Sequence, residues 1–182
     1  MTTVFIIIIA VIIIWIIITY NLFIRDKNLI REAWSGIDVQ LKRRHNLIPN
    51  LVASVKGYSQ HEKTLLENLT QKRSEAVQIE NINDIAPAES DLSGMIKNLI
   101  VVAENYPGLK ASSNFIDLQK QLVEIEDQLQ YARRYYNGAV RNYNIRVESF
   151  PSNIISGIFN FKPDIFFEIS LATERKSPEV KL

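Results

Sequence analysis

The residues with the most evident chemical potential lie in one stretch, residues 32–52, EAWSGIDVQLKRRHNLIPNLV. Its Lys-Arg-Arg-His run could contact phosphates. The chain as a whole carries 21 Lys and Arg against 20 Asp and Glu. A general nucleic-acid binder needs a broad basic surface, so no nucleic-acid partner is expected. We interpret Arg44 as a residue on a helix seam that pairs with Glu124, Glu126 or Asp127 and fixes the register of two helices.

The two histidines, His45 and His61, do not have the spacing of a metal site. A di-metal bundle needs a Glu three residues before each His, but Lys42 and Tyr58 stand at those positions. The chain has no Cys, which removes thiol nucleophiles and zinc-thiolate sites. It also has no nucleophile elbow and no phosphate-binding loop. The sequence therefore predicts no enzyme, with no catalytic residue, metal, cofactor or small-molecule substrate.

A second polar stretch, RRYYNGAVRNYN at residues 133–144, combines aromatic, Arg and Asn residues. Such residues can stack on single-stranded RNA. Tyr136 and Tyr143 lie on a heptad stripe, however, so we predict that they are core residues whose hydroxyl groups reach a partner. Asn137 and Asn144 follow them and are predicted to form hydrogen bonds between helices, because buried amides are usually paired.

The elements that position these residues begin with a predicted membrane-spanning helix at the N-terminus. Residues 4–18 contain no polar side chain, and a bilayer core requires about 20 helical residues, so 1–24 is predicted to be a transmembrane signal anchor with its helix at 3–24. A cleaved signal peptide fits less well, because no basic region precedes the segment and no small-residue cleavage site follows it. Arg25, Lys27 and Arg31 follow the span, which places the N-terminus outside and the rest in the cytoplasm.

After the anchor, apolar residues recur every three or four positions, which predicts an all-α fold. We expect the transmembrane helix to continue into an antiparallel, four-helix-type bundle over residues 25–149. Two long helices are predicted at 25 to about 57–60 and from Ser112 or Ser113 to 149. Two short helices are predicted at 61–79 and about 89–105, with a loop at 80–91 and a turn at 106–110. Pro49 is predicted to kink the first long helix or to break it.

The short helices can cover only half of the long pair, which leaves the membrane-proximal half with an apolar surface in need of a partner. The C-terminal tail, residues 150–182, is apolar to residue 169 and polar and loose from 172. Its apolar part is expected to pack on that half or to lie in the membrane interface. A second copy of the chain is the other candidate. The candidate interaction residues are Trp34, Ile37, Arg44, Tyr136, Tyr143, Phe159 and Phe161.

Three blocks carry a family resemblance: EAWSGIDVQLKRRHNLIPNLVASVKGYSQHE, VVAENYPGLKASSNFIDLQKQLVEIEDQL and ARRYYNGAVRNYNIRVESFPSNIISGIFNFK. Over about residues 20–162 the chain resembles the LemA family. The resemblance implies a single-pass protein of the bacterial inner membrane with a cytoplasmic helical bundle, and it brings no catalytic residue. We expect a scaffold that binds membrane lipid and self-associates or binds a membrane protein, in membrane organisation or envelope stress. The alternative is an adaptor that recruits or regulates a membrane peptidase or signalling protein.

Overall fold

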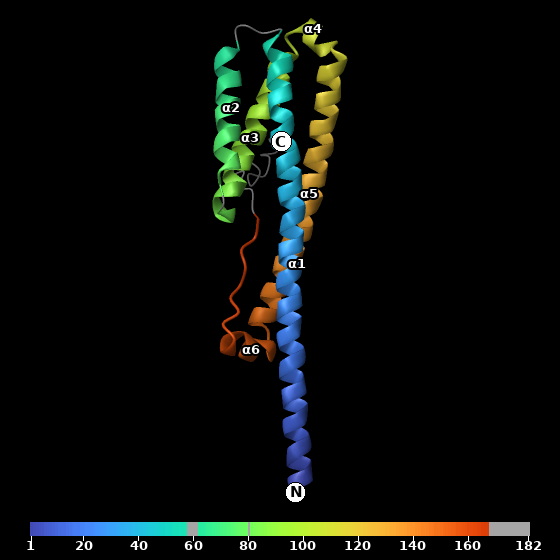
Figure 1. Ribbon diagram of the computed structural model, residues 1–182, viewed down its shortest axis with the longest axis vertical. Coiled ribbons are helices and arrows are strands. Elements are labelled where there is room, and N and C mark those ends of the chain that lie inside the picture. The colour runs from blue at the N-terminus through green and yellow to red at the C-terminus, as the bar shows by residue number, and fades with distance from the viewer. Residues whose placement is uncertain (58–61, 80, 168–182) are drawn as a thin grey trace, which may run out of the picture. The chain divides into compact units, whose positions relative to one another are not determined.

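The computed structural model describes residues 1–57, 62–79 and 81–167, and all regular structure in these ranges is helical. The helices are α1 (Thr2–Lys56), α2 (Lys63–Val77), α3 (Ile82–Ala103), α4 (Pro107–Lys110), α5 (Ser113–Glu148) and α6 (Ser152–Ile158), labelled in Figure 1. The predicted all-α class is confirmed. The predicted helix start at His61 and the polar end of the tail lie outside the described residues.

α1 is a single helix of 55 residues that begins in the apolar N-terminal segment. By length and composition it is the one described helix that can cross a membrane, and the side chains of its isoleucine-rich start are largely exposed. The helix continues through Pro49, so the predicted possibility of a break there is wrong. An apolar helix that leads without interruption into core residues indicates membrane anchoring of the chain.

The described chain divides into two compact units. Unit 1 contains residues 1–38 and 130–166, and unit 2 contains residues 39–129 together with Phe167 among the described residues. α1 and α5 are long enough to contribute to both units. Each unit is therefore built on one segment of each long helix.

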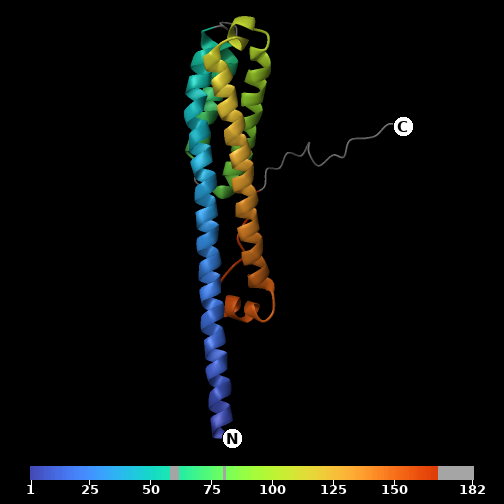
Figure 2. The ribbon, with the colours of Figure 1, turned by 90° about the vertical axis from the view of Figure 1, so that its right-hand side faces the viewer.

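Unit 2 is a helical bundle in which the end of α1, α2, α3 and the start of α5 run alongside one another (Figures 1 and 2). Their apolar residues recur every three or four positions and meet in one core, as the periodicity predicts. The buried members of this core are Ile48, Leu51, Val55, Leu66, Leu69, Ala76, Leu92, Ile96, Leu99, Ala103, Leu109, Phe115, Leu118 and Leu122.

Two connections in unit 2 are more helical than expected. The predicted loop at 80–91 is wrong, because α3 begins at Ile82 and is capped by Asn81, whose side chain accepts the N–H of Asn83 at 3.0 Å. Pro87 lies within the early turns of this helix, and burial of Ala86 and Glu89 holds the segment in place. The predicted turn at 106–110 contains the one-turn helix α4, which starts with Pro107, a residue suited to a first helical position.

Unit 1 combines the first part of α1, the last part of α5, α6 and the extended segment that follows it. α6 lies beside α1 and the end of α5 in both views (Figures 1 and 2). Its end is set by Asn160, which has a φ of 54°, a left-handed conformation that Asn tolerates. The N–H of Phe161 donates to the carbonyl of Ser156 at 2.9 Å, the six-to-one bond of a Schellman motif. This turn directs Phe161 back toward α1.

Candidate functional site

The centre of unit 2 holds a buried charge network around Arg44, whose side chain is only 2% exposed. Its Nη1 lies 3.1 Å from Glu89 Oε2 on α3. Its Nη2 lies 3.5 Å from Glu126 Oε2 on α5 and also donates to the Ser93 hydroxyl. One guanidinium therefore connects three helices, and this planar group with five donors suits such a role. Glu126, one of the three predicted partners, is confirmed.

The more buried partner of Arg44 is Glu89, which lies where the predicted loop (80–91) and the predicted helix (about 89–105) overlap. Its side chain is 1% exposed, and its second oxygen, Oε1, lies 2.7 Å from His45 Nε2. Both carboxylate oxygens are thus occupied, one by each of two adjacent α1 residues. A buried pair satisfied in this way fixes which faces of the helices meet.

Pro49 is tied to the same network through a backbone group. Proline has no N–H, so it cannot bond the carbonyl of the residue four positions earlier, which is His45. Arg73 of α2 supplies the missing donor, with its Nε 2.8 Å from the His45 carbonyl oxygen. The carbonyl that Pro49 leaves without a donor in α1 therefore accepts a hydrogen bond that links α1 to α2.

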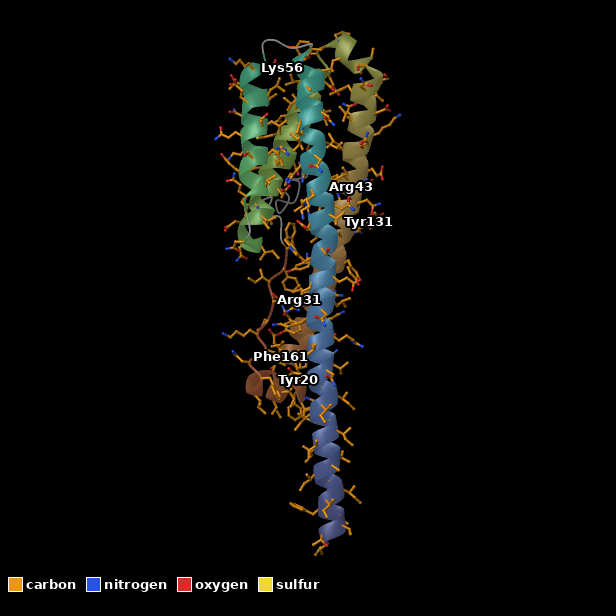
Figure 3. The ribbon with its side chains drawn as sticks, viewed as in Figure 1. Tyr20, Arg31, Arg43, Lys56, Tyr131 and Phe161 are labelled. Carbon is orange, nitrogen blue, oxygen red and sulfur yellow. The ribbon has the colours of Figure 1, made fainter. Side chains whose placement is uncertain are left out.

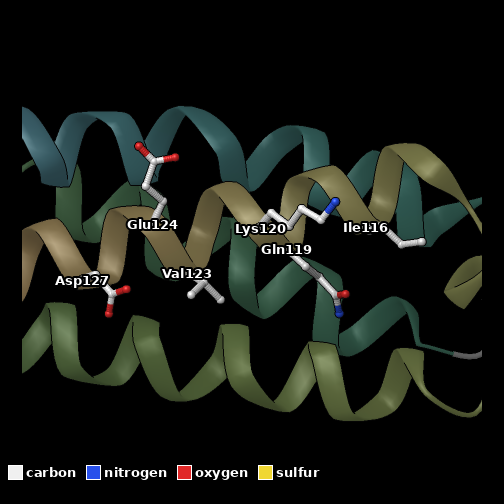
Figure 4. Close-up of a pocket in the computed structure, with 6 residues that line it drawn as sticks. All are labelled: Ile116, Gln119, Lys120, Val123, Glu124 and Asp127. Atoms are coloured by element: carbon white, nitrogen blue, oxygen red, sulfur yellow. The ribbon is translucent and has the colours of Figure 1, made fainter.

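The other two predicted partners of Arg44, Glu124 and Asp127, lie on the outer side of α5. They line a shallow pocket of about 450 Å³ together with Ile116, Gln119, Lys120 and Val123, all on α5 (Figure 4). A larger open groove of about 780 Å³ runs along α1 and α2. Among the described residues, no cluster of three His, Asp or Glu side chains has the arrangement of a metal site.

Unit 1 contains a cluster of aromatic rings. Phe161 stacks on Phe23, with ring centroids 4.7 Å apart, and Phe23 meets Tyr143 edge-on at 6.1 Å. Tyr20 contacts Phe159 and Phe161 at 4.8 and 5.7 Å, and Figure 3 shows Tyr20 and Phe161 at the same level of α1. These contacts mean that the tail packs back onto the anchored helix.

Trp34 packs edge-on against Tyr136, with ring centroids 5.7 Å apart. Of the predicted interaction residues in unit 1, Ile37, Tyr136 and Tyr143 are at most 2% exposed. Phe159 remains 46% exposed, and Trp34 is half-buried. The structure thus brings these residues together inside one unit, where the three buried ones contribute to internal packing.

Polar side chains of α5 hold the backbone of the tail. The Asn144 amide acts as a peptide mimic: Nδ2 donates to the Asp164 carbonyl at 2.9 Å, and Oδ1 accepts the Asp164 N–H at 2.8 Å. The Tyr136 hydroxyl donates to the Ile165 carbonyl at 3.0 Å. The prediction that Asn144 bonds another helix is therefore wrong, because the tail approaches it first.

The two buried tyrosines differ in their hydroxyl groups. Tyr136 has its partner, whereas the Tyr143 hydroxyl is buried without a hydrogen-bond partner among the described residues, contrary to the prediction. Burial, and secondly the charge of Asp164, raises the pKa of Tyr136 to about 12. Burial also raises the pKa of Tyr143, with contributions from Asp164 and Asp26. Both groups therefore favour the neutral phenol.

An ion pair that was not predicted from the sequence joins α1 to the end of α5 in unit 1. Asp26 of α1 is buried, and its Oδ2 accepts from Arg146 Nε at 2.7 Å across 120 residues of sequence. Next to this pair, the hydroxyl groups of Ser152 and Ser156 lie 2.7 and 2.9 Å from the Arg146 and Val147 carbonyls. The last carbonyls of α5, which lack helical partners, are thus satisfied by α6.

Comparison with known proteins identifies relatives of the chain. The chain is 25% identical over 175 residues to magnetosome protein MamQ 2 of Paramagnetospirillum magneticum, covering 82% of this chain and 64% of the relative. It is 29% identical over 138 residues to protein LemA of Metamycoplasma hominis, covering 75% and 63%. It is 21% identical over 174 residues to magnetosome protein MamQ of Magnetospirillum gryphiswaldense, covering 81% and 64%.

The chain thus spans 64% of the length of the first of these relatives, and none of the three names states an enzymatic activity. The LemA family model matches residues 33–182. This range includes the Arg44 network, Pro49 and all of α2 to α6. The chain belongs to the LemA family.

Proposed function

We propose that this protein is a membrane-anchored helical scaffold that self-associates, or binds partners, at the cytoplasmic face of the bacterial plasma membrane. The observation that carries the proposal is α1, one helix from Thr2 to Lys56. Its start exposes apolar side chains suited to lipid, and from Phe23 onward it supplies core residues. The membrane anchor and a part of each folded unit therefore belong to the same helix.

The charge distribution along α1 supports the proposed orientation. Arg25, Lys27 and Arg31 follow the apolar segment within two turns. Basic residues that flank a span are retained on the cytoplasmic side. We therefore place the N-terminus outside and the two units, apart from the span, in the cytoplasm.

The internal chemistry of the units supports a mechanical role. The charged groups at the centre of unit 2 are engaged with one another: Arg44 bonds Glu89 and Glu126, and His45 bonds the remaining Glu89 oxygen. Side chains committed to each other in this way set helix register. A unit with a fixed register presents a constant outer surface, as a scaffold must.

The test is the assembly state of the full chain in lipid nanodiscs, measured by imaging intact particles. We expect a defined homo-oligomer. Trp34→Ala removes the ring that packs on Tyr136 and should disturb assembly and protease resistance more than Lys42→Ala, the control on the same helix. Unchanged particle size and protease resistance in the Trp34 variant would contradict this account.

The alternative is an adaptor that recruits or regulates a membrane peptidase or a signalling protein. It is distinguished by co-purification from the native membrane. A monomer that carries one such partner in stoichiometric amount would replace the scaffold proposal. A large homo-oligomer without a stoichiometric partner would exclude the adaptor.

A further inference from the structure

The helix α6 and two residues that flank it, Phe150 and Phe159, carry apolar side chains that unit 1 covers only in part. The exposed fractions of Phe150, Ile154, Ile158 and Phe159 are 80, 50, 67 and 46%. On the other side of the same helix, Ile155 and Ser156 are 1 and 5% exposed. α6 thus has apolar side chains on both sides, and only one side is buried by the protein.

The membrane-spanning part of α1 sets the depth of this face. The turns from Thr2 to Ile18 cover roughly 25 Å at 1.5 Å per residue, whereas a bilayer core is about 30 Å thick. The next turn, Thr19 to Phe23, is therefore needed to complete the span. In the structure Thr19 and Phe23 are 5 and 0% exposed, so protein covers one side of α1 at this level.

The protein that covers this turn is α6 together with the residues that follow it. Phe159 meets Tyr20 with ring centroids 4.8 Å apart, and Phe161 stacks on Phe23 at 4.7 Å. Figure 2 shows α6 directly beside α1, and Figure 3 places Phe161 next to Tyr20. α6 therefore lies at the end of the spanning segment, where acyl chains give way to headgroups.

We propose that the face formed by Phe150, Ile154, Ile158 and Phe159, the α6 face, inserts into the lipid interface as a second membrane contact. Apolar helices bind there with one face at the boundary of headgroups and acyl chains. Lipid is the occupant because the anchored α1 brings it to this level in every copy of the chain. The proposal rests on the membrane anchoring stated above.

The charges at the same level suit anionic headgroups. The Arg25 side chain is 71% exposed, Lys162 is exposed, and Lys27 Nζ lies 6.0 Å from the centre of the Phe161 ring. The neighbouring acid Asp26 is buried and is paired with Arg146 at 2.7 Å and, over a longer distance of 3.6 Å, with Arg25. Basic side chains beside a bilayer are attracted by negatively charged lipids, so they and the α6 face act together.

The absence of native Cys permits a direct test with single spin labels. The full chain carrying Ile154→Cys or Ile158→Cys is labelled in vesicles that contain phosphatidylglycerol, and collisions with oxygen and with a water-soluble nickel chelate are measured. We expect oxygen collisions to exceed nickel collisions by several-fold at both sites. The matched control is Tyr131→Cys, at an exposed side chain of α5 in unit 1, where nickel collisions should dominate.

A further label at Ile8, which is 51% exposed in the apolar segment, separates this inference from the anchor itself. If Ile8 is in lipid while the α6 labels meet the nickel chelate, the α6 face lies in water and the inference is overturned. If the α6 labels meet neither reagent, protein covers the face, which also overturns it. If Ile8 itself is in water, the anchoring fails.

Discussion

The hydroxyl groups of Tyr136 and Tyr143 allow a matched comparison. Both rings are buried in unit 1, and among the described residues only the Tyr136 hydroxyl has a hydrogen-bond partner. A buried polar group without a hydrogen bond costs about 1–3 kcal/mol. Tyr143→Phe removes that cost, so we expect unchanged or increased stability. Tyr136→Phe loses the bond to Ile165 and should destabilise by about 0.5–1.5 kcal/mol. Urea unfolding of both variants measures the difference, and equal losses would contradict this reasoning.

Glu89 is the residue on which the unit 2 network depends most. Glu89→Ala leaves Arg44 buried without its closest carboxylate and His45 without its Nε2 partner. Breaking a buried pair from one side costs about 3–5 kcal/mol. The control is Glu75→Ala, which breaks an exposed pair with Lys72 and should change stability little. The midpoints of chemical unfolding test this, and similar values for the two variants would show that the network is not stabilising.

At the residue scale, sequence reasoning found Arg44 and Glu126 because both follow from helical periodicity. It missed Glu89 because the residue lies in a segment rich in Asn, Asp and Pro, a composition typical of loops. It also missed the pairing of Asp26 with Arg146, since 120 residues separate them. Single-sequence patterns report local geometry, whereas that contact depends on how two long helices align.

At the element scale, α1 shows how a proline is accommodated within a long helix. Pro49 leaves the His45 carbonyl without a donor within the helix, and Arg73 of α2 bonds it at 2.8 Å. Helical periodicity predicted the helical segments before and after the proline, and the core positions along them. A kink at Pro49 stays a prediction, since whether the ladder bends depends on the donor that α2 provides.

This arrangement predicts coupling between Pro49 and Arg73. Arg73→Ala should destabilise the protein by about 1–3 kcal/mol, because a carbonyl loses its donor. In a Pro49→Ala background the new N–H can bond His45, so the same Arg73 change should cost much less. A double-mutant cycle measures the coupling, with Arg43→Ala on the exposed side of α1 as the uncoupled control. Additive effects of Pro49 and Arg73 would refute the shared role of the His45 carbonyl.

At the scale of the whole molecule, the all-α class and the two long and two short helices were predictable because they follow from periods of three and four. The additional helices α4 and α6 are too short to carry such a period.

The two buried tyrosines of unit 1 affect the stability of the whole molecule, because their raised pKa values link folding to pH.

Stability should fall at alkaline pH for a defined reason. The pKa of Tyr136 is raised to about 12 in the folded chain, against about 10 for an unfolded tyrosine. The folded state therefore holds this proton more tightly. The resulting stabilisation is fully present below pH 10 and is lost as pH rises toward 12. Thermal melts between pH 8 and 12 should decline less steeply for Tyr136→Phe than for the unmodified chain, and parallel curves would contradict the linkage.

The separation between Asp26 and Arg146 also has a consequence for biosynthesis. The ribosome makes the apolar start of α1 first, and Arg146 follows Asp26 by 120 residues. At about 5–20 residues per second, the interval is roughly 6–24 s. During that time the anchor can enter the membrane while Asp26, directly after it, lacks its partner Arg146 and has only the adjacent Arg25 beside it. The aspartate then faces water or headgroups until α5 is complete, so closure of unit 1 is a late event that follows translation of nearly the entire chain.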